Sequence, residues 1–112
     1  MKKNILVVDD QKALCFIIRE VFKDRYNVEV AHDENELKNI LKRMYPHIGI
    51  FDYHLNGHNG LELLKWAKEQ CPDMECILMT AYDIWEIKKS VPPFVSILKK
   101  PFDINDLKTI IE

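Results

Sequence analysis

Short unbroken apolar runs alternate along this chain with stretches in which apolar residues recur every three or four positions. The unbroken runs are typical of strands buried on both faces, and the spaced positions are typical of amphipathic helices. The runs predict strands at residues 5–8, 27–31, 48–51, 76–79 and 94–98. The spaced stretches predict helices within residues 13–22, 33–45, 59–71, 83–90 and 103–111.

The order of these elements indicates the fold class. Strands that alternate regularly with helices favour a parallel sheet covered by helices on both faces. The connections between such strands are expected to be right-handed. The sequence therefore predicts an α/β protein with a doubly wound, five-stranded parallel sheet. We find no internal repeat, linker or low-complexity tract in the chain.

Polar side chains stand where four of the predicted strands end. Asp9 and Asp10 follow the first strand, Asp52 the third, Thr80 the fourth and Lys100 the fifth. In open parallel sheets the functional site lies at the carboxyl ends of the strands. We therefore expect these side chains to converge on one edge. The plainer alternative is that the two adjacent aspartates are only a polar loop or a helix cap.

The chemistry of this set favours a divalent cation and a phosphoryl group. Three adjacent carboxylates cannot all ionise at low cost without a cation, and oxygen ligands suit Mg2+. A carboxylate beside Mg2+ can attack phosphorus and become an aspartyl phosphate. A lysine ammonium offsets charge on the phosphoryl oxygens, and a threonine hydroxyl can donate a hydrogen bond to one of them.

Length and composition limit the other possibilities. The chain has 112 residues, enough for one domain, and a net charge of −2, which gives no general attraction to nucleic acid or to an anionic membrane. No apolar stretch approaches the roughly 20 residues of a membrane span, so no membrane insertion is expected. The cysteines, Cys15, Cys71 and Cys76, form no disulfide framework. This pattern fits a cytoplasmic protein, with Cys15 in the core.

Four segments carry a resemblance to a known family. They are ILVVDDQ, PHIGIFD, ILMTA and KKPFD, in this order and each at a strand end. With them the chain resembles the receiver domain of bacterial two-component response regulators. It is most similar to the single-domain regulators of sporulation phosphorelays. The resemblance implies one receiver domain over residues 1–112, with a CheY-like (flavodoxin-like) fold and the strand order 2-1-3-4-5.

The resemblance also implies a role for each acidic residue. Asp52 matches the aspartate that is phosphorylated and that also binds the metal. Asp10 matches the direct Mg2+ ligand, and Asp9 matches its water-mediated or supporting partner. His54 would supply its backbone carbonyl to the metal. The phosphoryl donor would be a phosphohistidine on a sensor histidine kinase or on a phosphotransfer protein.

Further roles follow from the same resemblance. Thr80 matches the hydroxyl that switches on phosphorylation, and Lys100 matches the amine that binds the phosphoryl group. His54 and Tyr82 occupy the two positions that screen the phosphoryl group from water, and both are bulky. The implied protein catalyses its own phosphotransfer and dephosphorylation, is not a conventional enzyme, and signals through contacts with other proteins.

The sequence departs from the family pattern at several positions. Asn56 replaces a common proline in the loop after Asp52, and Asn59 replaces an acid. Pro92-Pro93 replace a turn of small residues, and Ile97 replaces the aromatic residue that usually moves on activation. We therefore expect little change on activation around the fourth helix, the fifth strand and the last helix. Recognition should centre on the first helix and the acceptor loops.

Other functions explain the sequence less well. A degenerate receiver that only binds a partner should lack an acid, the threonine or the lysine. A phosphohydrolase of the haloacid-dehalogenase type needs an aspartate where His54 stands. A nucleotide-binding module would need a glycine-rich loop or a P-loop, and neither is present. Zinc sites at Cys71 and Cys76, or at His54 and His58, lack suitable spacing.

Overall fold

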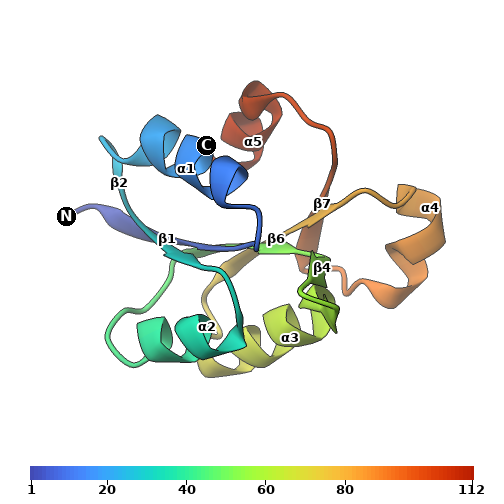
Figure 1. Cartoon of the computed structure of the whole chain (residues 1–112), viewed down its shortest axis with the longest axis horizontal. Coiled ribbons are helices and arrows are strands. Elements are labelled where there is room, and N and C mark those ends of the chain that lie inside the picture. The colour runs from blue at the N-terminus through green and yellow to red at the C-terminus, as the bar shows by residue number, and fades with distance from the viewer.

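The computed structural model describes residues 1–112, and a five-stranded parallel sheet forms its centre. The strands are β1 (Lys3–Val8), β2 (Tyr26–Ala31), β3 (Ile48–Asp52), β6 (Glu75–Thr80) and β7 (Val95–Lys99). They lie in the order β2-β1-β3-β6-β7 (Figure 1). Because β6 and β7 are the fourth and fifth strands of this sheet along the chain, the predicted order 2-1-3-4-5 is confirmed.

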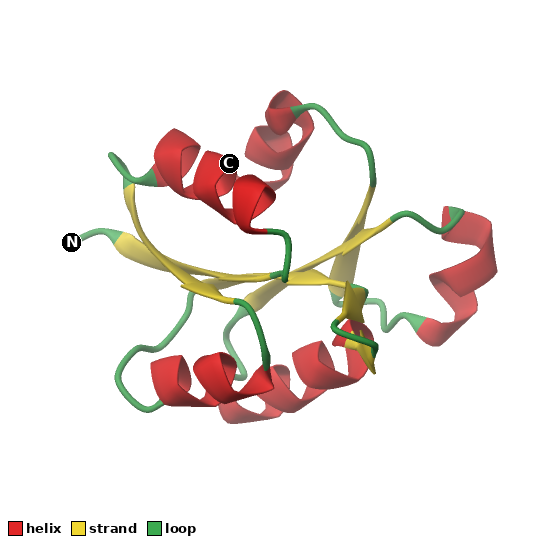
Figure 2. Cartoon of the chain, in the orientation of Figure 1, coloured by secondary structure: helices red, strands yellow, loops and turns green.

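Helices cover both faces of the sheet, as Figure 2 shows. One face carries α1 (Lys12–Phe22) and α5 (Ile104–Ile111), and the other carries α2 (Glu34–Leu41) and α3 (Gly60–Gln70). The short α4 (Ile84–Ile87) runs into a 3-10 turn at Lys88–Ser90, near the β7 edge. The predicted helix at 83–90 is therefore only one turn of α-helix followed by a tighter turn.

The alternation of side chains along β1 divides the interior into two hydrophobic cores. Leu6 and Val8 pack on the side of α2 and α3, and Ile5 and Val7 pack on the side of α1 and α5. All four side chains are fully buried. A central strand with both faces covered must be apolar throughout, which explains the unbroken run in the sequence.

The helix predicted at 33–45 is shorter in the structure. Asp33 caps it, since its carboxylate accepts the N–H of Glu36. The reciprocal bond of a capping box is displaced by one residue, because the Glu36 carboxylate accepts the N–H of His32. The helix ends at Leu41, so Met44 packs against the core from the following turn rather than from the helix.

The segment after β3, predicted as a plain loop, contains a small hairpin. Strands β4 (His54–Leu55) and β5 (His58–Asn59) pair in antiparallel fashion. The tip residues Asn56 and Gly57 have φ values of 50° and 78°, as a type I′ turn requires. Asn-Gly is the strongest sequence signal for that turn, so the hairpin was predictable. Leu55 is buried and anchors it to the α2/α3 core.

The three cysteines are free and buried. Burial, helped by the charge of Asp9, raises the pKa of the Cys15 thiol to about 12. Cys15 is only 2% exposed and belongs to the α1/α5 core, which confirms its predicted core position. None of the helices combines the length and hydropathy that a membrane crossing requires.

Candidate functional site

The ends of the parallel strands bring the predicted polar residues to one edge of the sheet. Asp9 follows β1, and Asp52 is the last residue of the adjacent strand β3. On the other side of β3, Thr80 is the last residue of β6. Lys100 follows β7, and its N–H donates to the Thr80 carbonyl at 2.6 Å. Asp9 and Lys100, which are 91 positions apart in the sequence, thus meet at one edge of the sheet.

Three carboxylates form a compact cluster at this edge. One oxygen from each of Asp9, Asp10 and Asp52 lies within 4.8 Å of the others. Asp9 is fully buried and Asp52 is 8% exposed. Burial, followed by the negative charge of Asp9, raises the pKa of the Asp52 carboxyl above its usual range. The cluster therefore attracts positive charge.

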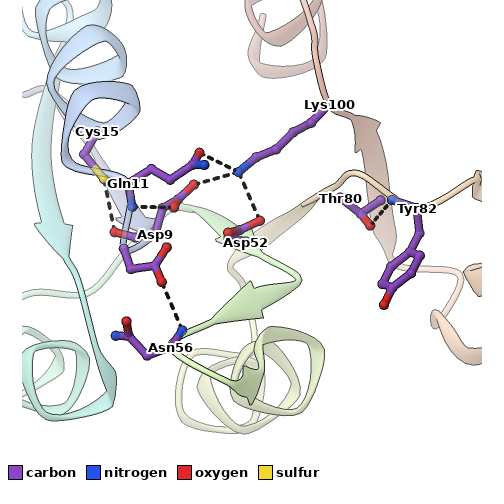
Figure 3. A network of polar contacts seen from close by, with 9 residues as sticks. Asp9, Gln11, Cys15, Asp52, Asn56, Thr80, Tyr82 and Lys100 are labelled. Carbon is purple, nitrogen blue, oxygen red and sulfur yellow. Dashed lines mark hydrogen bonds and ion pairs between the residues drawn. The ribbon is translucent and has the colours of Figure 1, made fainter.

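Lys100 provides the compensating charge (Figure 3). Its Nζ lies 3.2 Å from an Asp9 oxygen and 3.2 Å from Asp52 Oδ1. The third partner is the side-chain oxygen of Gln11, at 3.1 Å. An ammonium has three N–H bonds, so Lys100 is fully occupied by these partners. The charge of Lys100 and its hydrogen bond lower the pKa of Asp52, and so oppose the effects of burial and of Asp9.

Gln11 belongs to the site although the sequence prediction gave it no role. It is the N-cap residue of α1, and its backbone N–H donates to Asp9 Oδ1 at 2.8 Å. Its side chain at the same time accepts from Lys100. The only signal in the sequence was its position directly after the two aspartates. That signal does not tell which way a long side chain points.

Thr80 lies at the edge but is not bonded to Asp52. Its side chain is buried, and its hydroxyl oxygen accepts the backbone N–H of Tyr82 at 3.0 Å. In Figure 3 the Thr80 and Tyr82 pair stands apart from the group around Lys100. The hydroxyl proton is free to bond elsewhere, and a switching role for Thr80 stays a prediction.

Three aromatic rings, from the segments that follow Asp52 and Thr80, stand together. The Tyr53 ring meets the His54 ring edge-on at 5.3 Å and the Tyr82 ring edge-on at 5.6 Å. The rings of His54 and Tyr82 are 5.0 Å apart. Tyr53 is half-buried, whereas the other two side chains are exposed. Tyr53, which the sequence prediction did not single out, packs against the α2/α3 core and contacts both of the other rings.

The donor set fits a small divalent cation. All the candidate ligand atoms are carboxylate oxygens, which Mg2+ and Ca2+ prefer over nitrogen or sulfur. Mg2+ needs only one or two protein carboxylates because it keeps several waters. Asp10 and Asp52 can supply these oxygens, with Asp9 neutralised in part by Lys100. His54 lies two residues beyond Asp52, at the start of β4.

The fold and the site together define a class. A doubly wound sheet with strand order 2-1-3-4-5, an acidic cluster and a lysine at the carboxyl edge are the marks of a signalling receiver domain. The family model described as "Response regulator receiver domain" matches residues 5–112. The chain belongs to this family, and its function is that of a phosphoacceptor response-regulator receiver.

Similar proteins agree with this assignment. Sporulation initiation phosphotransferase F of Bacillus subtilis is 29% identical over 100% of this chain and 93% of that protein. A CheY-like receiver domain protein from Methanospirillum hungatei is 26% identical, with a TM-score of 0.83 over 99% of this chain and 91% of its own. A response regulator from Burkholderia pseudomallei, solved with a phosphorylated aspartic acid and a calcium ion, shares the fold at 22% identity. Its TM-score is 0.81, over 99% of this chain and 67% of that one.

Proposed function

We propose that residues 1–112 are one receiver domain that takes a phosphoryl group from a phosphohistidine onto Asp52. The observation that carries the proposal is the position of Asp52, whose Oδ1 lies 3.2 Å from Lys100 Nζ and close to two further carboxylates. Because Oδ1 is held by the ammonium, the other carboxylate oxygen is free to attack phosphorus. A new P–O bond forms, the P–N bond to the donor imidazole breaks, and the imidazole leaves with the bond's electron pair.

Lys100 would also stabilise the phosphoryl group during the transfer. Its ammonium is within reach of the charge that develops on the transferred phosphoryl group, which such groups stabilise in phosphoryl transfer. Of its three partners only Gln11 is neutral, so the hydrogen bond to Gln11 is the weakest of the three. It is therefore the bond that a phosphoryl oxygen can replace at the lowest cost. Thr80 would donate its hydroxyl proton, which its bond with Tyr82 leaves free, to another phosphoryl oxygen.

Mg2+ is the cation we assign to the site, with Asp10 and Asp52 as ligands, Asp9 in support and the His54 carbonyl as a further oxygen. When bound, the ion offsets negative charge on the phosphoryl oxygens and on the acidic cluster. The burial of Asp9 and Asp52 supports this assignment, because buried carboxylates are costly and Lys100 supplies only one positive charge to the two.

The partners follow from the same chemistry. A sensor histidine kinase or a phosphotransfer protein would present the phosphohistidine, and the activated surface would contact a downstream protein in the cytoplasm. On α1, the apolar Phe16 and Ile17 are 62% and 50% exposed. Exposed apolar side chains on the helix that begins at the acidic cluster support docking through this helix. The chain would act as a signalling module and catalyse only its own phosphotransfer and dephosphorylation.

The alternatives are not favoured. A degenerate receiver would lack part of the set, but both acids after β1, the acceptor, the threonine and the lysine are all present at one edge. A phosphohydrolase would require an acid two residues past Asp52, and His54 stands there.

Incubation with acetyl phosphate tests the proposed phosphorylation directly. We expect a gain of one phosphoryl group by intact-mass measurement, only when Mg2+ is present. Neutral hydroxylamine should remove it, because it cleaves acyl phosphates and leaves phosphate esters intact. Labelling in excess chelator would refute the requirement for Mg2+, and a label that resists hydroxylamine would refute the aspartyl phosphate.

The ring cluster predicts a long-lived phosphoryl group. In the double variant His54→Ala, Tyr82→Ala, loss of both exposed rings should admit water and speed hydrolysis several-fold. The decay of the labelled protein can be followed by intact mass, with Trp85→Ala as a control on an exposed ring outside the cluster. An unchanged decay rate would show that these rings do not screen the site.

A further inference from the structure

The tip of the β4–β5 hairpin lies against the acidic cluster. Asn56 is the first of the two central residues of the type I′ turn and stands outside the β4–β5 ladder. Its backbone N–H is therefore not used by the hairpin. That N–H donates to Asp10 Oδ2 at 3.1 Å. Asp10 accepts no other hydrogen bond, so its second oxygen, Oδ1, remains available.

A second bond holds the hairpin tip in place. The side-chain amide of Asn56 donates to the backbone carbonyl of His32 at 3.0 Å, just beyond the end of β2. Leu55, one residue earlier, is 1% exposed and fixes the hairpin to the core. The tip is thus attached both to the segment after β2 and to the carboxylate after β1.

This arrangement is specific to the residue at position 56. The family pattern commonly has a proline there, and a proline has no N–H to donate and cannot adopt a φ of 50°. Asparagine tolerates the left-handed conformation better than most residues, and its amide supplies the bond to His32. One substitution relative to the family pattern therefore provides both contacts.

We propose that Asn56 is a positioning residue that orients Asp10 for the divalent cation, an inference that rests on the proposed function. A carboxylate that ligates Mg2+ uses one oxygen, and a hydrogen bond to its other oxygen fixes the direction of the first. The N–H of Asn56 donates to Oδ2 and leaves Oδ1 for the cation. The same bond places a partial positive charge beside three carboxylates that repel one another.

Mg2+ titration of two variants by calorimetry tests this role. Asn56→Pro removes the N–H and the turn, and is expected to weaken Mg2+ binding by about tenfold, the lower end for loss of an outer-shell partner. Asn56→Gly keeps the N–H and tolerates the turn but loses the bond to His32, so it should weaken binding by less. His58→Ala is the matched control, because this exposed side chain of the same hairpin makes no hydrogen bond.

Hydrogen exchange on the unmodified chain provides a measurement without mutation. In chelator the Asn56 amide should exchange with D2O more slowly than the Gly57 amide, which has no acceptor. Equal exchange of the two amides would overturn the inference. So would variants that bind Mg2+ as tightly as the unmodified chain, or more tightly. If the unmodified chain itself binds no Mg2+, it is the proposed metal site that fails.

Discussion

Replacing Gly60 with alanine is expected to destabilise the fold by at least about 3 kcal/mol. Gly60 is the first residue of α3, and its N–H donates to the Tyr53 carbonyl at 2.7 Å. A Cβ at this position would overlap the backbone carbonyl oxygen of Asp52 and lie 3.1 Å from that of Tyr53. These backbone segments cannot shift easily to make room, because Asp52 ends a strand that is paired with a neighbour on both sides.

Denaturant unfolding of Gly60→Ala measures this effect, with Gly57→Ala as the matched control. At Gly57 an added Cβ meets nothing within 4 Å, but the φ of 78° disfavours a side chain. That variant should lose only about 1–2 kcal/mol. Because the clash at Gly60 involves the acceptor's own carbonyl, Gly60→Ala should also lower the rate of phosphorylation. Equal losses of stability in the two variants would contradict the close approach of α3 to Asp52.

Asp52→Asn is expected to abolish phosphorylation completely and yet to raise the melting temperature of the metal-free protein at neutral pH. The first effect follows because an amide is not the nucleophile that the proposed transfer needs. The second follows because the Asp52 carboxylate is buried and repelled by Asp9. A neutral amide of similar shape avoids both costs, and Lys100 keeps Asp9 and Gln11 as partners.

The stabilising effect of Asp52→Asn should depend on pH in a definite direction. Burial and the charge of Asp9 raise the pKa of Asp52 in the folded state above the unfolded value of about 3.9. The folded state therefore binds this proton more tightly than the unfolded state does. The stability that this gives is fully present below the unfolded pKa and is lost as the pH rises through the folded pKa. The increase in melting temperature caused by Asp52→Asn should thus be small near pH 4 and larger at pH 7.

Thermal unfolding in chelator between pH 4 and pH 8 checks this prediction. Asp73→Asn serves as the control, because this carboxylate is exposed and lies outside the cluster. Added Mg2+ should raise the melting temperature of the unmodified chain more than that of Asp52→Asn, since the ion binds the native site. A variant that melts below the unmodified chain at pH 7 would show that Asp52 is stabilising as a charged group.

The sequence alone was sufficient to predict the sheet and to indicate where its site lies. Apolar runs such as Ile5–Val8 can be buried only in the middle of a covered sheet, and residues after such runs must stand at its carboxyl edge. The positions of Asp9, Asp52 and Lys100 at one edge follow from that rule. The Asn-Gly pair at 56–57 also carried a turn signal, which would have predicted the hairpin.

The contacts within the site were decided by the tertiary structure. Lys100 can reach Asp9, Asp52 and Gln11 only because the packing of the strands and of α1 sets their distances to within an ångström or two, and local sequence patterns do not encode such distances. The same holds for Thr80, which bonds to Tyr82 rather than to Asp52. It holds also for Asn56, whose N–H meets Asp10 across a separation of 46 residues. Hydrophobic periodicity is a local property of the chain and determines the elements, whereas hydrogen bonds between distant side chains depend on how those elements pack.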